Sequence, residues 1–172
     1  MLSELNQLPI PVIGRINGSA YGGGLGLISC CDIAIAVESA TFSLREVTLG
    51  LIPATISPYV VKRLGESNAR RMMLNARRYN AREALQLGLI HRVVRDEELD
   101  DAVEEEVRAI QCCAPEAVSA SKDLIAAVDG QSTDEVFGET IERLAQTWET
   151  ESCQEGIVAF LEKRKPTWNP ED

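Results

Sequence analysis

The chain has 172 residues, of which 45% are hydrophobic, and it carries a formal net charge of −10 with a pI near 4.7. A chain of this length can form one hydrophobic core but has little room for a second full domain. The excess of acidic side chains disfavours nucleic acid and anionic membranes as binding partners. Every apolar run is interrupted well short of the ~20 residues that a membrane span needs, so we expect no membrane association.

The N-terminus and the cysteines indicate where the protein resides. The first residues, MLSELNQLPIPVIGRING, lack the basic segment and apolar stretch of a secretory signal peptide, so we predict a cytoplasmic location. Cys30–Cys31 and Cys112–Cys113 are adjacent pairs, whereas zinc sites and disulfide frameworks use spaced pairs. We therefore expect free thiols, no metal site and no redox cofactor.

The pattern of predicted elements changes once along the chain. Up to about residue 95, short strands alternate with helices. The strands are predicted over residues 11–16, 32–37 and 41–44, and the helices over 66–76 and 81–88. Beyond that point almost every segment has helical spacing: 96–111, 115–128 and 133–165. The sequence thus predicts an α/β core over residues 1–95 and a helical region over 96–172.

A glycine-rich turn lies in the first part. The stretch AYGGGLGLISCCDIAIA, residues 20–36, places Gly22, Gly23 and Gly24 before a short apolar helix and a strand. Glycine has no Cβ, so the backbone here can adopt positive φ and approach another molecule closely. The free N–H groups of the helix N-terminus suit a phosphate or a carbonyl oxygen that gains negative charge. Tight packing of the helix on a strand is the alternative explanation, since the pattern matches no complete nucleotide-binding motif.

A single acid, Glu46, lies in the following segment, ATFSLREVTLGLIPATISPYV, with leucine and valine on both sides. Apolar surroundings disfavour the charged carboxylate, so this side chain is predicted to donate as well as accept a proton near neutral pH. The alternative is an exposed glutamate that forms an ion pair with its neighbour Arg45.

Together these motifs resemble the enoyl-CoA hydratase/isomerase (crotonase) family. The resemblance runs through PIPVIGRINGSAYGGGLGLISCCDIAIAVESATFSLREVTLGLIPA and ARRMMLNARRYNAREALQLGLIHRVV to EGIVAFLEKRKPTW, so it covers essentially the whole chain. It implies a spiral of ββα units, followed by C-terminal helices that hold a homotrimer or hexamer. It also implies an acyl-CoA thioester as substrate, with coenzyme A as part of that substrate and no separate cofactor.

The resemblance assigns backbone and nucleotide-binding roles. In the family, two backbone N–H groups polarise the thioester carbonyl, and one of them corresponds to Gly23, with Gly22 and Gly24 beside it. The residues that correspond to Phe160 and Lys163 reach the CoA nucleotide, often from a neighbouring subunit. Family members also have an N-terminal portion that supplies the other N–H and much of the CoA-binding loop. We expect both of these elements to be missing from this chain.

The resemblance also assigns the proton-transfer groups. Family hydratases commonly carry two catalytic glutamates, of which the second corresponds to Glu46 and the first to Gly26, which cannot transfer a proton. The backbone N–H of Ala54 corresponds to the position that helps to hold water. The segment LIPATISPYVV is similar to that of 3-methylglutaconyl-CoA and carboxygeranoyl-CoA hydratases, whose substrates carry a distal carboxylate. We therefore expect a lyase that hydrates a branched, carboxylated enoyl-CoA in leucine or isoprenoid breakdown.

Two other functions remain open on the sequence. An isomerase, a decarboxylase or a thioester hydrolase of the same fold would use Glu46 with the same oxyanion site. A catalytically silent oligomerisation module would explain Gly26 at the first glutamate position. His91, the single histidine, is predicted to be structural.

Overall fold

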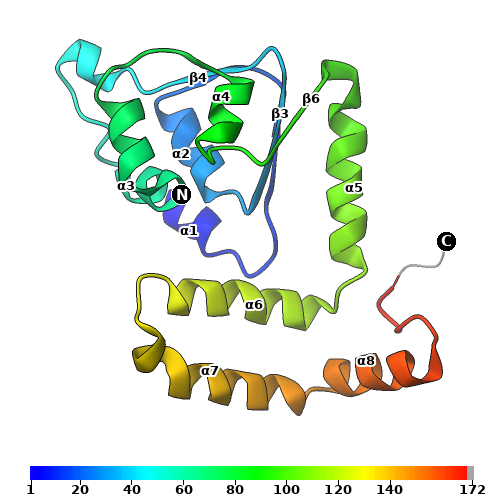
Figure 1. Cartoon of the computed structure of the whole chain (residues 1–172). Coiled ribbons are helices and arrows are strands. Elements are labelled where there is room, and N and C mark those ends of the chain that lie inside the picture. Colours follow the sequence, from blue (N-terminus) through cyan, green and yellow to red (C-terminus); the bar gives the residue numbers. More distant parts are fainter. Residues whose placement is uncertain (170–172) are drawn as a thin grey trace. The chain divides into compact units, whose positions relative to one another are not determined.

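The computed structural model describes residues 1–169 and divides the chain into two compact units (Figure 1). The first unit contains Met1–Leu8 and Val12–Glu105, and the second contains Pro9–Pro11 and the chain from Glu106 onward. The boundary falls within helix α5 (Leu99–Gln111). No helix in the described residues has both the length and the apolar character needed to cross a membrane.

The first unit contains two three-stranded sheets. Their strands are β1 (Ile13–Ile16), β2 (Ala20–Tyr21), β3 (Ile33–Val37), β4 (Thr41–Ser43), β5 (Tyr79–Asn80) and β6 (Arg92–Val94). One sheet has the order β1-β3-β6 and is parallel, while in the other, β2-β4-β5, the last pair is antiparallel. β1 and β2 therefore belong to different sheets, as do β3 and β4, and each of these two pairs is followed by a helix. This ββα repeat confirms the predicted α/β class.

The helices of the first unit are α1 (Leu2–Asn6), α2 (Gly23–Cys30), α3 (Ser57–Met73) and α4 (Ala81–Gln86), with 3₁₀ turns at Glu46–Leu49 and Asp96–Glu98. Helix α2 contacts both α1 and α3. Helix α3 is interrupted at Gly65, whose φ of 70° and ψ of 160° are not helical, so its second part begins where the helix over residues 66–76 was predicted and ends earlier, at Met73. It cannot continue through Ala76, because that residue has a positive φ of 50°, which a right-handed helix excludes.

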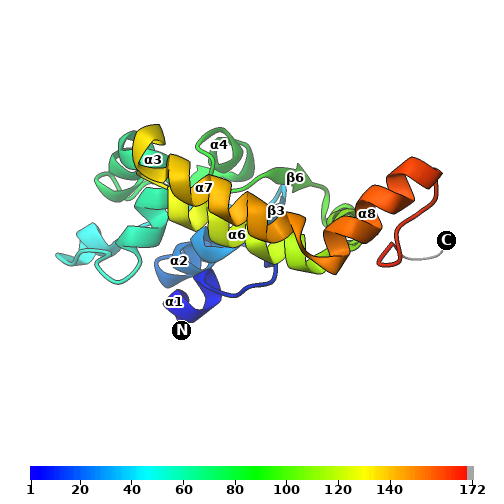
Figure 2. The same ribbon diagram turned by 90° about the horizontal axis from the view of Figure 1, so that it is seen from below.

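The second unit is helical. Its helices α6 (Pro115–Val128) and α7 (Thr133–Trp148) lie alongside each other in both ribbon views, and α8 (Glu151–Glu162) follows (Figures 1 and 2). The single helix predicted over 133–165 is therefore wrong. The helical stretch is interrupted at Thr150, because the Thr150 hydroxyl accepts a hydrogen bond from the Cys153 N–H and caps a new helix.

The core of the first unit forms around β3 and α2. Residues Ala34–Val37 are all buried, as expected for a parallel strand that is covered on both faces. The largest side chains that pack with them are fully buried: Leu25, Phe42, Met72, Tyr79 and Leu99. His91 contributes a polar contact, since its Nδ1 accepts a hydrogen bond of 2.9 Å from the Ala34 N–H.

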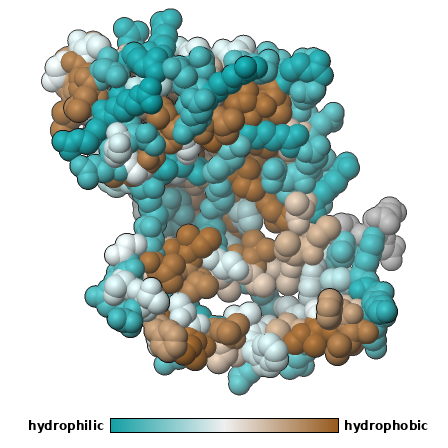
Figure 3. All heavy atoms as spheres, viewed as in Figure 1, coloured by the Kyte–Doolittle hydropathy of each residue, from teal (hydrophilic) through white to brown (hydrophobic). Residues whose placement is uncertain are grey.

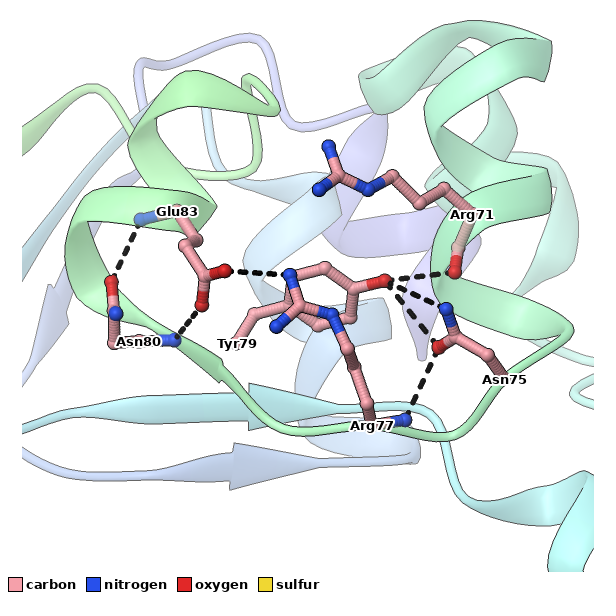
Figure 4. A network of polar contacts seen from close by, with 6 residues as sticks. All are labelled: Arg71, Asn75, Arg77, Tyr79, Asn80 and Glu83. Carbon is pink, nitrogen blue, oxygen red and sulfur yellow. Dashed lines mark hydrogen bonds and ion pairs between the residues drawn. The ribbon is translucent and has the colours of Figure 1, made fainter.

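A polar network around Tyr79 holds the turn between α3 and β5 (Figure 4). The Tyr79 hydroxyl donates a hydrogen bond of 2.8 Å to the Arg71 carbonyl and lies 3.4 Å from the Asn75 side chain. The Arg77 guanidinium stacks 4.0 Å from the centroid of the Tyr79 ring and donates to Glu83 at 2.6 Å. Because this ion pair and a backbone N–H both favour the ionised form, the pKa of Glu83 is lowered.

Replacing Tyr79 with Phe is expected to lower the free energy of unfolding by about 1 kcal/mol, because the hydroxyl is buried and its partners lose a hydrogen bond. Denaturant unfolding measures this change. Tyr59→Phe is the matched control, because the Tyr59 hydroxyl makes no hydrogen bond to any described residue. Equal midpoints for the two variants would contradict the role of the network.

An ion pair in the second unit predicts a pH dependence. Arg164 donates hydrogen bonds of 2.7 and 2.8 Å to the Glu155 carboxylate and lowers its pKa from 4.5 to about 2. The stabilisation is therefore complete above pH 4.5 and is lost as the pH falls toward 2. Carboxyl NMR titration of Arg164→Gln should show the Glu155 pKa rising toward its ordinary value. Arg143→Gln, which breaks a different ion pair, should leave it low; an unchanged Glu155 titration in Arg164→Gln would refute the assignment.

Candidate active site

The N-terminus of α2 presents an open backbone surface. Gly22 precedes the helix with φ 52° and ψ −118°, and its N–H donates to the Ser43 carbonyl at 3.2 Å. No side chain caps the helix, and a Cβ placed on Gly23 would have no described atom within 4 Å. The N–H of this first helical residue has no acceptor within the helix. It is therefore available to an acceptor from outside the chain, with space beside it.

The other two glycines of the turn make close contacts instead. A Cβ on Gly24 would lie 3.2 Å from the Ala20 Cβ, so this position serves the packing of α2 on β2. A Cβ on Gly22 would lie 3.2 Å from Oε1 of Glu46, so the missing side chain makes space for that carboxylate. Packing, the alternative reason for the glycines, therefore applies at Gly24, whereas the close approach of another molecule stays a prediction.

Glu46 is half-buried at the start of a 3₁₀ turn, directly beside the glycines. Its Oε2 is buried and has no hydrogen-bond partner among the described residues. Within residues 1–169, Glu46 forms no ion pair with Arg45. The alternative of an exposed glutamate that is paired with Arg45 is therefore wrong. A buried acceptor oxygen without a partner is suited to take a proton from a bound molecule.

The position of the missing first glutamate is filled. Gly26 is buried in α2, and a Cβ there would lie 2.4 Å from Cγ2 and 3.0 Å from Cβ of Ile56. Real Cβ contacts are never this short, so Ile56 occupies the space that any side chain at residue 26 would need. Ile56 is itself buried at the start of α3. The site therefore has one carboxylate, and an aliphatic side chain stands where the second would be.

The remaining predicted residues have these local surroundings. Ala54 is exposed, and its N–H already donates to the Ile52 carbonyl at 2.8 Å, so holding water would require breaking this bond. Phe160 and Lys163 belong to the second unit, at the end of α8. Phe160 is 81% exposed, and Lys163 ends the helix with a left-handed φ of 57°. Each of the five cysteines is a free thiol.

The sequence did not indicate the role of Ser43. This serine is fully buried; its hydroxyl donates to the Ala76 carbonyl at 3.0 Å and its own carbonyl accepts the Gly22 N–H. It therefore connects the turn after α3 to the glycine turn. In the sequence, the only signal for this role was a single serine within the strand predicted over residues 41–44.

Comparison with known proteins decides the family. Residues 1–171 match the family described as enoyl-CoA hydratase/isomerase. The chain belongs to this family. A crystal structure of an enoyl-CoA hydratase from Shewanella pealeana ATCC 700345 has 44% sequence identity and a TM-score of 0.91, over 97% of this chain and 63% of that chain.

Two curated relatives show the spread of the family. A carnitinyl-CoA dehydratase of Proteus mirabilis (strain HI4320) is 37% identical over 172 residues, with 97% of this chain and 66% of that protein covered. A mitochondrial enoyl-CoA hydratase domain-containing protein 3 of Danio rerio is 33% identical, with 100% and 60% covered. The chain thus spans about two thirds or less of the length of these relatives.

The contact between Gly26 and Ile56 makes a prediction about stability. Gly26→Ala should lower the free energy of unfolding by about 1–3 kcal/mol through overpacking, although alanine favours a helix. Adding Ile56→Ala should restore space, so the double variant should be more stable than the sum of the single changes predicts.

Gly138→Ala is the matched control for this measurement. It also lies within a helix, but a Cβ there meets nothing within 4 Å. It should be neutral or stabilising by up to about 1 kcal/mol. Equal effects of Gly26→Ala and Gly138→Ala on the denaturation midpoint would show that the space beside Gly26 is not filled.

Proposed function

We propose that this chain acts on an acyl-CoA thioester and adds water to the double bond of a branched, carboxylated enoyl group such as that of 3-methylglutaconyl-CoA. The observation that carries the proposal is the position of the unpartnered Glu46 carboxylate beside the glycine turn of α2. Membership of the enoyl-CoA hydratase/isomerase family supports the thioester as substrate.

The glycine turn supplies electrostatic stabilisation. The thioester carbonyl accepts a hydrogen bond from the Gly23 N–H, and the positive end of the α2 dipole favours the enolate oxygen that forms during proton transfer. One such donor typically contributes about 3 kcal/mol to the transition state. This oxyanion site needs no metal or cofactor from the chain.

Glu46 transfers the proton. In hydration, the oxygen of water bonds to Cβ of the enoyl group and a proton bonds to Cα. Because Ile56 fills the space beside Gly26, a second glutamate cannot activate the water. The proton of the water passes to Glu46, which delivers it to Cα. If the distal carboxylate of the substrate takes it instead, Glu46 starts protonated, gives its own proton to Cα and regains one from that carboxyl group.

The helical unit supports a proposed homotrimer or hexamer. Large apolar side chains of α7 and α8 are exposed, and Figure 3 shows hydrophobic residues gathered over the helices of this unit. These side chains are Phe137, Ile141, Leu144, Trp148, Phe160 and Leu161. Exposed apolar surface of this extent favours association. In such an assembly, Phe160 and Lys163 would contact the CoA nucleotide of a neighbouring subunit. The cytoplasmic location stays a prediction.

The same geometry favours one second candidate, the isomerisation of an enoyl-CoA double bond. A single carboxylate can remove a proton from one carbon and return it to another, and this reaction needs no activated water. The aliphatic side chain of Ile56 beside Gly26 is compatible with such a water-free step.

Loss of the enoyl-thioester absorbance tests the proposal. Incubation with 3-methylglutaconyl-CoA should give turnover that falls by at least about 100-fold in Glu46→Gln, because the amide cannot exchange a proton. Glu66→Gln is the control, since Glu66 is exposed on α3 and pairs only with Arg70. Full activity of Glu46→Gln would overturn the proposal, and product mass would separate hydration from isomerisation.

A further inference from the structure

Three residues that the family resemblance did not assign meet at one end of the sheet β2-β4-β5. Strand β2 ends at Tyr21, and Arg45 follows the end of β4 by two residues. Arg78 directly precedes β5. Since β4 is parallel to β2 and antiparallel to β5, the ends of the first two strands and the start of the third lie at the same edge.

One arginine of this cluster lies beside the phenol group of Tyr21. The Arg78 guanidinium lies 5.9 Å from the centroid of the Tyr21 ring. The Tyr21 hydroxyl lies 2.8 Å from Oγ1 of Thr41, and Tyr21 is 42% exposed. Hydrogen bonds with Thr41 and Ser19, and then the charges of Arg78 and Arg45, lower the pKa of Tyr21. The Arg78 guanidinium therefore lies beside an exposed phenol, on which the charge of Arg45 also acts.

The two arginines have no internal counter-ion. The chain carries a net charge of −10, and neighbouring arginines are paired with acids: Arg77 with Glu83 and Arg70 with Glu66. Over residues 1–169, neither Arg45 nor Arg78 forms an ion pair. Two unpaired arginines at the same end of a sheet, one of them beside a hydroxyl, are suited to bind a carboxylate or a phosphate.

This cluster adjoins the candidate active site. Tyr21 directly precedes Gly22, and Arg45 directly precedes Glu46. We propose that Arg45 and Arg78 bind the distal carboxylate of the acyl group, with the Tyr21 hydroxyl as a further donor. The proposal rests on the proposed function, in which the thioester carbonyl is held at Gly23. From there a short acyl chain extends to neighbouring residues, whereas the CoA phosphates lie at the far end of the pantetheine arm.

Binding of two unreactive thioesters tests the proposal without any turnover. Glutaryl-CoA and valeryl-CoA have acyl chains of equal length and differ in the distal carboxylate, and neither has a double bond. Calorimetry with the full chain should show a Kd for glutaryl-CoA about tenfold lower, as expected for a charged hydrogen bond at a partly exposed site. Arg45→Gln and Arg78→Gln should each reduce this preference, and the double variant should abolish it. Arg70→Gln, on α3, should leave the ratio unchanged.

The outcomes separate this proposal from the proposed function. Equal weakening of both thioesters in the arginine variants would assign these residues to the CoA phosphates and overturn the carboxylate site. Equal binding of both by the unmodified chain would also overturn it, even with turnover that depends on Glu46. A preference that depends on the arginines, without turnover, would support this site and contradict the catalytic proposal. Binding of neither thioester would contradict both.

Discussion

The approach of the Glu46 carboxylate to Gly22 is the constraint on which the site depends. With 3.2 Å between Oε1 and the position of a Cβ, only glycine leaves the carboxylate this close to the start of α2 without displacing it. The surrounding structure holds both partners in place. Ser43 fixes the Gly22 N–H through its carbonyl and the turn after α3 through its hydroxyl. The Tyr79 network in turn holds that turn against the core.

This arrangement also explains why no second glutamate stands at residue 26 of the candidate site. Helix α2 packs so closely on the start of α3 that residue 26 has no space for a side chain, and Ile56 fills the volume. Restoring a glutamate by a single substitution would therefore disrupt packing before it changed the chemistry. A site with one proton-transfer group is best suited to a substrate that carries its own carboxylate. Arg45 and Arg78, which are unpaired, are proposed to bind this carboxylate. Their proposed role is thus linked to the packing of Ile56 against Gly26.

The sequence predicted the regular elements well where local signals were strong. The bounds of α6 were correct because Pro115 at its start and Gly130 after its end set them directly. The break at Thr150 was missed, since a threonine cap within a long amphipathic stretch gives little signal. The two-residue strands β2 and β5 were also missed, because their pairing is set by tertiary contacts. The family and the fold followed from motifs that cover the chain, as the match over residues 1–171 confirms.

The candidate site was only partly predictable. The role of Glu46 was predicted from its apolar surroundings and from the resemblance, and that of Gly23 from the resemblance. The structure brings Glu46 to the glycine turn, although both catalytic roles stay predictions. No pattern in the sequence indicates that Ile56 lies against Gly26, that Ser43 joins two turns, or that Arg78 lies beside the Tyr21 ring. Each of these contacts joins residues from different elements. Their geometry depends on how strands and helices pack, which spacing along the chain does not encode.

Exchange of the α-protons of butyryl-CoA in deuterium oxide tests the central claim most directly, because it requires only Glu46 and the glycine turn. The account predicts that the chain incorporates deuterium at Cα. Gly22→Ala should reduce the rate by at least about tenfold, since the new Cβ displaces the carboxylate and a misplaced group can lose this much or more. Gly18→Ala, where a Cβ meets nothing within 4 Å, should exchange at the unmodified rate. Equal rates for the two variants would contradict the account.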